Sequence, residues 1–122
     1  MQLLSEGSDE GQMNGLGWIK GRVKKFEKKN ILQKPYVPHM GWNTVTPNVG
    51  HKIFHGIDQE FGFYFVHSYY FKPFHAENIL ATSFYGSEFA SAVFSDNIFG
   101  VQFHPEKSHS NGIRLLKNFA EY

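Results

Sequence analysis

The chain has 122 residues, 41% of them hydrophobic and 17% aromatic, which allows one domain with an apolar core. A net charge of +1 argues against nucleic acid as a partner, and the lack of cysteine excludes disulfides and cysteine-based zinc sites. No apolar run reaches the roughly 18 residues of a membrane span, and no signal sequence is evident, so we expect a cytoplasmic protein.

The first elements along the chain are short and polar. Residues 1–7 have the pattern of the last turns of a helix that ends at a glycine. Residues 5–21 form a loop whose glycines lack the spacing and the preceding strand of a dinucleotide-binding fingerprint. We therefore expect these glycines to serve turns.

A basic stretch follows, because residues 20–34 hold seven of the twelve Lys and Arg side chains. The pattern predicts a hairpin of strands 22–27 and 31–34, whose lysines would protect a sheet edge from pairing with other strands. A docking patch for an anionic sugar phosphate is the alternative interpretation.

Residues 36–46 combine prolines with Met40 and Trp42 in a predicted loop. This composition fits a buried loop and an interface core equally well. Residues 47–61 predict a connecting loop with a helical turn near 53–56. Its two histidines lack the third ligand and the general base of a zinc motif, so no metal site is expected.

Residues 62–70 predict a strand with a continuous apolar run, as in a strand that is covered on both faces. Residues 78–85 and 90–96 predict antiparallel strands, and a turn at 95–97 leads to the next strand. The last element, 111–122, predicts a helix that is capped by Ser110 or Asn111. Its apolar stripe, formed by Ile113, Leu116 and Phe119 and widened by Leu115 and Ala120, would cover the sheet.

The most informative stretch is Gly-Val-Gln-Phe-His-Pro-Glu-Lys-Ser at residues 100–108. An apolar run from Asn97 to Phe103 predicts a buried strand, and proline after His104 favours extended backbone at the histidine. His104 and Glu106 would then lie on one side of the chain. A carboxylate in that position can accept the Nδ1–H of the imidazole and leave Nε2 free as a base.

The same stretch resembles the His/Glu signature of the class I, or triad, glutamine amidotransferases. Within that family the chain resembles the glutaminase subunits of imidazole glycerol phosphate synthases. Three more stretches agree, in the order of the family: Met1–Leu4, Pro38–Asn43 and Phe63–Tyr70. The resemblance implies an α/β fold, namely the C-terminal part of an open, mostly parallel sheet with an antiparallel extension and flanking helices.

The resemblance also assigns roles to residues. His104 and Glu106 would be catalytic. Gln2, Glu10, Ser68 and Tyr69 would bind glutamine, with the backbone at Ser68 and Tyr69 holding the α-carboxylate. The segment His39, Met40, Gly41, Trp42 and Asn43 would face the synthase partner, a (β/α)₈ cyclase that receives ammonia for histidine biosynthesis. No cofactor, membrane or nucleic acid is implied.

The nucleophile of the family is a cysteine in Gly-x-Cys-x-Gly-Met-Gln, and the present chain begins at that Met-Gln. We therefore expect residues 1–122 to be a single partial domain that lacks the nucleophile elbow and is inactive alone. The alternatives are a related subunit that feeds a surface-sugar amidination enzyme, a catalytically dead remnant that only binds a partner, and a small histidine-based acid/base or metal protein.

Overall fold

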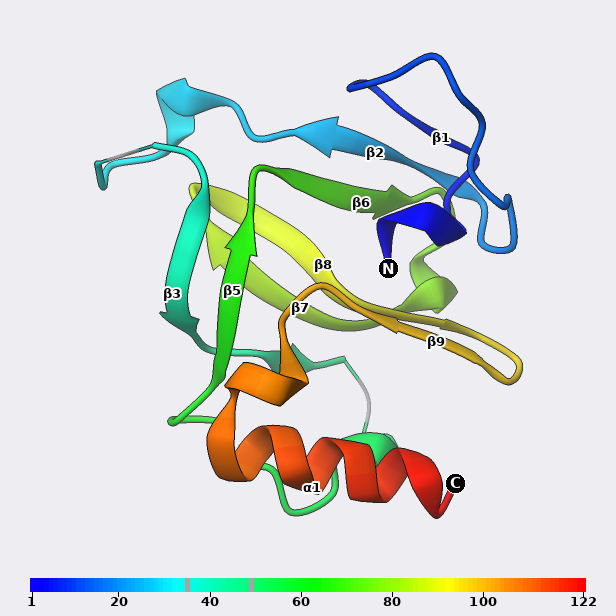
Figure 1. Cartoon of the computed structure of the whole chain (residues 1–122), viewed down its shortest axis with the longest axis vertical. Helices are drawn as coiled ribbons and strands as arrows, with labels where there is room; N and C mark the ends of the chain where they lie inside the picture. The colour runs from blue at the N-terminus through cyan, green and yellow to red at the C-terminus, as the bar shows by residue number, and fades with distance from the viewer. Residues whose placement is uncertain (35, 49) are drawn as a thin grey trace.

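The computed structural model describes residues 1–34, 36–48 and 50–122. Small sheets lie above one C-terminal helix in Figure 1. The regular elements are β1 (Gly7–Ser8), β2 (Gly21–Lys25), β3 (His39–Asn43), β4 (Thr46–Pro47), β5 (Phe63–His67), β6 (Tyr69–Pro73), β7 (Ile79–Tyr85), β8 (Ser87–Ser95), β9 (Ile98–Val101) and α1 (His109–Ala120). Short 3₁₀ turns are η1 (Gln2–Leu4), η2 (Lys28–Asn30), η3 (Lys52–Phe54), η4 (Ala76–Asn78) and η5 (Pro105–Lys107).

The strands form three sheets, in the orders β1-β2-β6, β3-β5 and β4-β7-β8-β9. The mixed α/β class is confirmed. The pairs among the described residues are antiparallel except for β1 with β2, so this chain shows chiefly the antiparallel part of the expected architecture. The reason is topological: parallel neighbours usually need a crossover helix, and α1 follows the last strand.

The hairpins of the third sheet were predicted well. Strands β7 and β8 join through Gly86, which has a φ of 73° and lies so close to the Asn30 carbonyl that a Cβ would sit 2.7 Å from it. Strands β8 and β9 join at Asp96, where φ is 52°. Short polar residues tolerate this left-handed backbone, which is why the turn was recognisable from the sequence.

Two predictions from the first third of the chain are wrong. The hairpin of 22–27 with 31–34 does not form, because β2 is instead the central strand between β1 and β6. The two-residue strand β1 covers only Arg22 and Val23, whereas Lys24 and Lys25 pair with β6 alone. Residues 1–7 contain only the 3₁₀ turn η1 rather than the end of an α-helix.

The predicted strand 62–70 breaks at Ser68 into β5 and β6, which belong to different sheets. Along β5 the residues Phe63, Phe65 and His67 are buried and alternate with half-buried neighbours, so one face is fully covered. The main core lies on that face, and half of its buried members are aromatic: Phe26, Phe54, Phe63, Phe65, Tyr85, Phe89 and Phe103.

Two histidines lie within this aromatic core. His39 is 4% exposed and His67 is 8% exposed, and they face each other across the β3–β5 pair. The ring of His39 stacks on Phe65 at 4.7 Å and on Tyr85 at 4.2 Å. Burial, with His67 nearby, lowers the pKa of His39 to about 3, and burial lowers the pKa of His67 to about 4.

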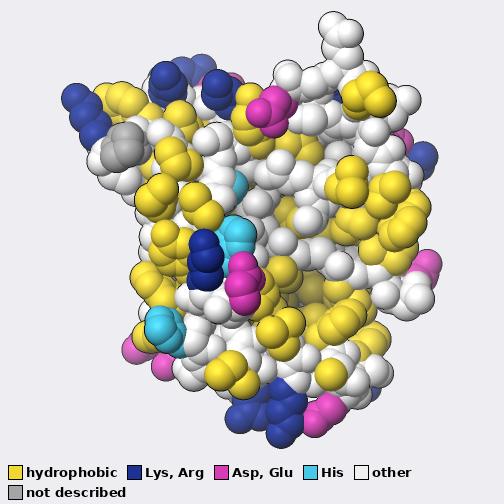
Figure 2. Space-filling view, viewed as in Figure 1, with side chains coloured by type: hydrophobic (Ala, Val, Ile, Leu, Met, Phe, Trp, Pro, Cys, Tyr) yellow, Lys and Arg dark blue, Asp and Glu magenta, His cyan; other side chains and the backbone are white. Residues whose placement is uncertain are grey.

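The buried face of helix α1 shares only Leu115 with the apolar stripe that the sequence predicted. Asn111, Gly112 and Leu115 are buried, whereas Ile113, Leu116 and Phe119 are exposed by 72%, 51% and 53%. Figure 2 shows hydrophobic side chains gathered on this side of the molecule, over α1 among other elements. The helix begins after Ser108, not at Ser110 or Asn111.

Asn111 explains the rotation of the helix. Its Oδ1 accepts a hydrogen bond from the Asp58 N–H (3.0 Å), and its Nδ2 donates to the carbonyls of Asp58 (2.7 Å) and Gly62 (2.8 Å). The next residue, Gly112, lies so close to the Pro105 carbonyl that no Cβ fits there. The hydrogen bonds of Asn111 and the close contact of Gly112 with Pro105 therefore decide which face of the helix is buried. The apolar stripe alone predicts a different buried face.

We predict that Asn111→Ala lowers the free energy of unfolding by about 2–4 kcal/mol, because it leaves three backbone groups without their partner in a buried site. The matched control is Asn118→Ala, which removes bonds to the Ile53 and His55 carbonyls from a less buried position and should cost less. Urea unfolding followed by circular dichroism measures both. Equal stability of Asn111→Ala and the parent chain would contradict this role.

We also predict that the stability falls as the pH is lowered from 7 to 5. The folded pKa values of His39 and His67 are depressed, so the unfolded chain binds more protons in this range. Their contribution is complete above an unfolded pKa of about 6.5 and is lost on acidification, on the order of 2 kcal/mol for each histidine by pH 5. Urea midpoints across this range measure the loss, and His39→Phe should reduce its slope. A pH-independent midpoint would contradict the assignment.

Candidate active site

His104 and Glu106 are in contact, as their spacing predicts. His104 has extended backbone (φ −103°, ψ 96°), Pro105 begins η5, and the Nδ1 of His104 lies 2.8 Å from Oε1 of Glu106. Hydrogen bonds from its own backbone N–H and from His104 hold the pKa of Glu106 below its ordinary value. An ionised Glu106 accepts from Nδ1–H, which leaves Nε2 of His104 with its lone pair.

Ser108 fixes the backbone around this pair. It is fully buried, its Oγ donates to the His104 carbonyl (2.6 Å) and accepts from the Tyr64 N–H (3.0 Å). The His104 N–H also donates to the Tyr64 carbonyl at 2.9 Å. The segment after β9 is therefore tied to β5. Ser108 was not recognised from the sequence, where its place at the end of the motif is the only signal.

Gln2 bonds the segments that follow strands β5 and β9. Its Nε2 donates to the Tyr69 carbonyl, just after β5, and to Oε1 of Gln102, just after β9, both at 2.8 Å. Strand β9 is half-buried at the edge of its sheet and ends at Val101, so the prediction of a buried strand reaching Phe103 is wrong. Gln102 was not recognised from the sequence.

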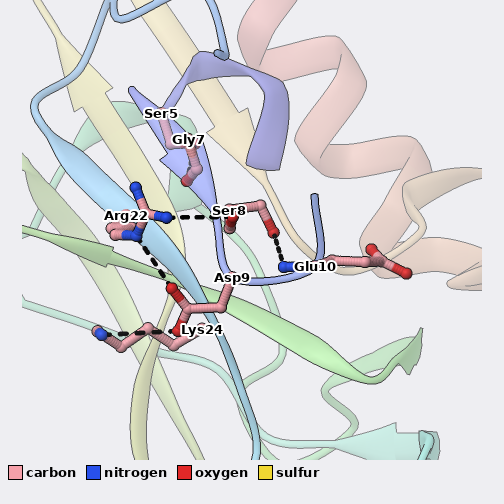
Figure 3. A network of polar contacts seen from close by, with 7 residues as sticks. All are labelled: Ser5, Gly7, Ser8, Asp9, Glu10, Arg22 and Lys24. Atoms are coloured by element: carbon pink, nitrogen blue, oxygen red, sulfur yellow. Dashed lines mark hydrogen bonds and ion pairs between the residues drawn. The ribbon is translucent and has the colours of Figure 1, made fainter. Parts of the chain in front are cut away.

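Glu10 and Gln2 line one cavity of about 330 Å³ near the start of the chain. The backbone N–H of Glu10 donates to Ser8 Oγ at 3.1 Å, and its carboxylate points away from the neighbouring ion pairs (Figure 3). In those pairs Asp9 binds Arg22 at 2.9 Å and Lys24 at 3.7 Å. The Arg22 hydrogen bond is the main reason that the pKa of Asp9 is lowered.

The structure therefore joins some predicted ligand residues and separates others. Tyr69 is bonded to Gln2 through its carbonyl, and the carbonyl of Ser68 accepts from the Phe26 N–H at 3.3 Å. Neither Ser68 nor Tyr69 lines the cavity with Glu10, and His104 does not line it either.

The segment His39–Asn43 is strand β3 and not a loop, which corrects the sequence-based prediction. Met40 and Trp42 are exposed by 62% and 43%, whereas His39 is buried. The Trp42 ring lies 4.8 Å from Phe61 and stacks on His109 at 5.5 Å. Because side chains alternate between the two faces of a strand, His39 lies in the core, whereas Met40 and Trp42 lie on the opposite, exposed face.

Within the described ranges, no three His, Asp or Glu side chains gather as metal ligands would. His51, one of the two histidines weighed for zinc, instead accepts the Ile53 N–H at 3.3 Å through its Nδ1. No helix in the part of the chain that the structure covers is long and apolar enough to cross a membrane.

Comparison with known proteins identifies the family of the chain. Residues 1–121 match the family described as glutamine amidotransferase class-I. The chain is 49% identical to the imidazole glycerol phosphate synthase subunit HisH of Bdellovibrio bacteriovorus over 121 residues, 99% of this chain and 59% of that protein. It is 51% identical to the HisH subunit of Neisseria meningitidis over 125 residues (99% and 58%). It is 49% identical to HisH 2 of Pseudomonas aeruginosa over 120 residues (98% and 58%).

The chain thus spans less than two-thirds of the length of these curated relatives. The family match, in contrast, covers nearly all of its own residues, including the contacting His104 and Glu106. The chain belongs to the class I glutamine amidotransferase family.

Proposed function

We propose that this chain is part of the glutaminase subunit of an imidazole glycerol phosphate synthase, which hydrolyses glutamine and delivers ammonia for histidine biosynthesis. The observation that carries the proposal is the 2.8 Å contact between His104 Nδ1 and Glu106, in a chain about half identical to HisH subunits. In such a pair the histidine is the base and the carboxylate is the orienter of a nucleophile–base–orienter triad.

The proposed reaction needs a thiol, and the chain contains no cysteine. We assign the thiol to the part of the glutaminase that this chain does not span, so that residues 1–122 form a partial domain. Nε2 of His104 takes the proton of that thiol, and the thiolate adds to the side-chain carbonyl of glutamine. The proton passes to the leaving ammonia, and water then cleaves the thioester to give glutamate.

The charges around His104 suit this role. Glu106 stays ionised and stabilises the imidazolium that forms when the base takes its proton. The bonds of Ser108 and Tyr64 restrict the backbone, so the imidazole needs little reorganisation during proton transfer.

Gln2, Glu10, Ser68 and Tyr69 form the proposed glutamine pocket. The shared cavity of Gln2 and Glu10 supports a place for the α-amino group, because a carboxylate and an amide oxygen both accept hydrogen bonds. Gln2 also contacts Tyr69, whose backbone we assign, with that of Ser68, to the α-carboxylate.

The surface of β3 is the proposed contact for a (β/α)₈ cyclase partner. Met40 and Trp42 project outward there, and Phe61 extends the aromatic surface. Exposed aromatic and methionine side chains are enriched at the centres of protein interfaces. Ammonia released at His104 would pass to the partner beside this strand.

The test uses a chimera in which residues 1–122 replace the matching segment of the Neisseria meningitidis HisH subunit, assayed with the cyclase of that organism. We predict glutaminase activity, and a loss of at least about 10³-fold in kcat for His104→Ala, because a triad without its base loses most of its rate. Glutamate release measures this.

The matched control is His75→Ala, which removes an exposed histidine and should leave kcat unchanged. A folded chimera without activity would contradict the proposal and favour a binding module that has lost catalysis. Activity that survives His104→Ala would contradict the assignment of the base.

We predict separately that the 122-residue chain releases no glutamate from glutamine, since the sequence supplies no thiol to attack the amide. A coupled glutamate dehydrogenase assay measures this. Glutamate release by the purified chain that His104→Ala abolishes would show that another nucleophile serves the site.

A further inference from the structure

The carbonyl of Tyr69 is the meeting point of two side chains from distant parts of the sequence. It lies 2.7 Å from Nδ1 of His67 and 2.8 Å from Nε2 of Gln2. A carbonyl oxygen only accepts hydrogen bonds, so both nitrogens must carry a proton. This contact fixes the position of the hydrogen on the His67 ring and the orientation of the Gln2 carboxamide.

The same reasoning gives the proton positions on the two buried histidines. With its proton on Nδ1, neutral His67 has an acceptor at Nε2, which lies 2.9 Å from Nδ1 of His39. His39 therefore carries its own proton on Nδ1, and its Nε2 accepts from Nδ2 of Asn43 at 3.2 Å. The second N–H of Asn43 donates to the Phe84 carbonyl at 2.8 Å. The donors along this path all point in one direction, from β3 toward Tyr69.

The surroundings keep both rings neutral. His67 packs against Phe26 at 5.3 Å and Phe89 at 5.3 Å, and burial is the largest cause of the lowered pKa of each histidine. A second proton on His67 would sit on Nε2, opposite the Nδ1–H of His39, and would break the 2.9 Å bond between the rings. A second proton on His39 would sit on Nε2, opposite the Nδ2–H of Asn43, and would break the 3.2 Å bond to that residue.

On the other side of the Tyr69 carbonyl, both N–H groups of the Gln2 carboxamide are already hydrogen-bonded. Its second N–H is taken by Oε1 of Gln102, at 2.8 Å, on the segment that leads to His104. Within the described residues the Oε1 of Gln2 makes no hydrogen bond. Gln2 therefore offers only an acceptor to a ligand in the cavity that it shares with Glu10.

We propose that His67 and His39 are positioning residues for ligand binding, which hold the Tyr69 carbonyl and through it the acceptor oxygen of Gln2. The inference rests on the proposed function for the identity of the ligand, glutamine, whose N–H donors fit two acceptors. It also places Asn43, on the proposed partner surface, four hydrogen bonds from Gln2. A movement of β3 is thereby transmitted to the ligand pocket without any contact between partner and ligand.

The first test does not depend on glutamine. Ring ¹⁵N chemical shifts of the ¹⁵N-histidine-labelled chain at pH 7 report which nitrogen carries the proton. The proposal requires a protonated Nδ1 and a bare Nε2 on both His39 and His67, assigned with single His→Asn variants. A protonated Nε2 on either ring, or a doubly protonated ring, would overturn it.

The second test uses two substitutions at His67 in the chimera. In Asn the amide nitrogen can take the place of Nδ1 and still donate to Tyr69, whereas in Gln the amide takes the place of Nε2 and loses that bond. We expect His67→Gln to raise KM for glutamine about tenfold, the loss of one good hydrogen bond, with kcat within about twofold. His67→Asn should keep KM near that of the parent. Equal KM values for the two variants would contradict the positioning role.

A second pair covers the case in which His67→Gln does not fold. His39→Asn retains a donor toward His67, whereas His39→Gln does not, so only His39→Gln should raise KM. A chimera that binds no glutamine would refute the proposed function, whereas the ring proton positions decide the hydrogen-bond path in either case.

Discussion

The hydrogen bond between His104 and Glu106 is the interaction on which the chemistry of the chain depends. It fixes the imidazole with its proton on Nδ1 and its lone pair on Nε2, in a chain that has no thiol of its own. The side chain of Glu106 is largely exposed. The backbone contacts of Ser108 and Tyr64 hold the pair in place, and Asn111 anchors the helix that follows.

The core contains a second set of polar contacts, the hydrogen bonds that join His39, His67 and the Tyr69 carbonyl. Buried histidines are costly unless each donor meets an acceptor, and His39 and His67 meet this condition only in one pattern of protons. That pattern ends on the Tyr69 carbonyl and so reaches Gln2. Base and ligand residues are thereby joined, since Gln2 also bonds Gln102, two residues before His104.

The sequence predicted local features best. The contact of His104 with Glu106 follows from a proline that extends the backbone, and the β7–β8–β9 hairpins follow from their turn residues. The place of β2 between two partners could not be predicted, because it depends on pairing with β6, almost fifty residues later in the chain. The orientation of α1 was predicted wrongly for a related reason, because Asn111 binds backbone groups that are far away in the sequence. Hydrophobic periodicity weighs several apolar residues against this one polar residue and therefore favours another face. The path through His39 and His67 is likewise invisible in the sequence, where each is a single histidine in a strand.

The most direct test of the account is a crystal structure of the chimera with glutamine bound and the thiol in place. The account predicts that Nε2 of His104 lies about 3–4 Å from the sulfur, within reach of its proton, while Nδ1 remains bonded to Glu106. An imidazole that is turned away from the sulfur, or a Glu106 that has left Nδ1 in the complex, would contradict it.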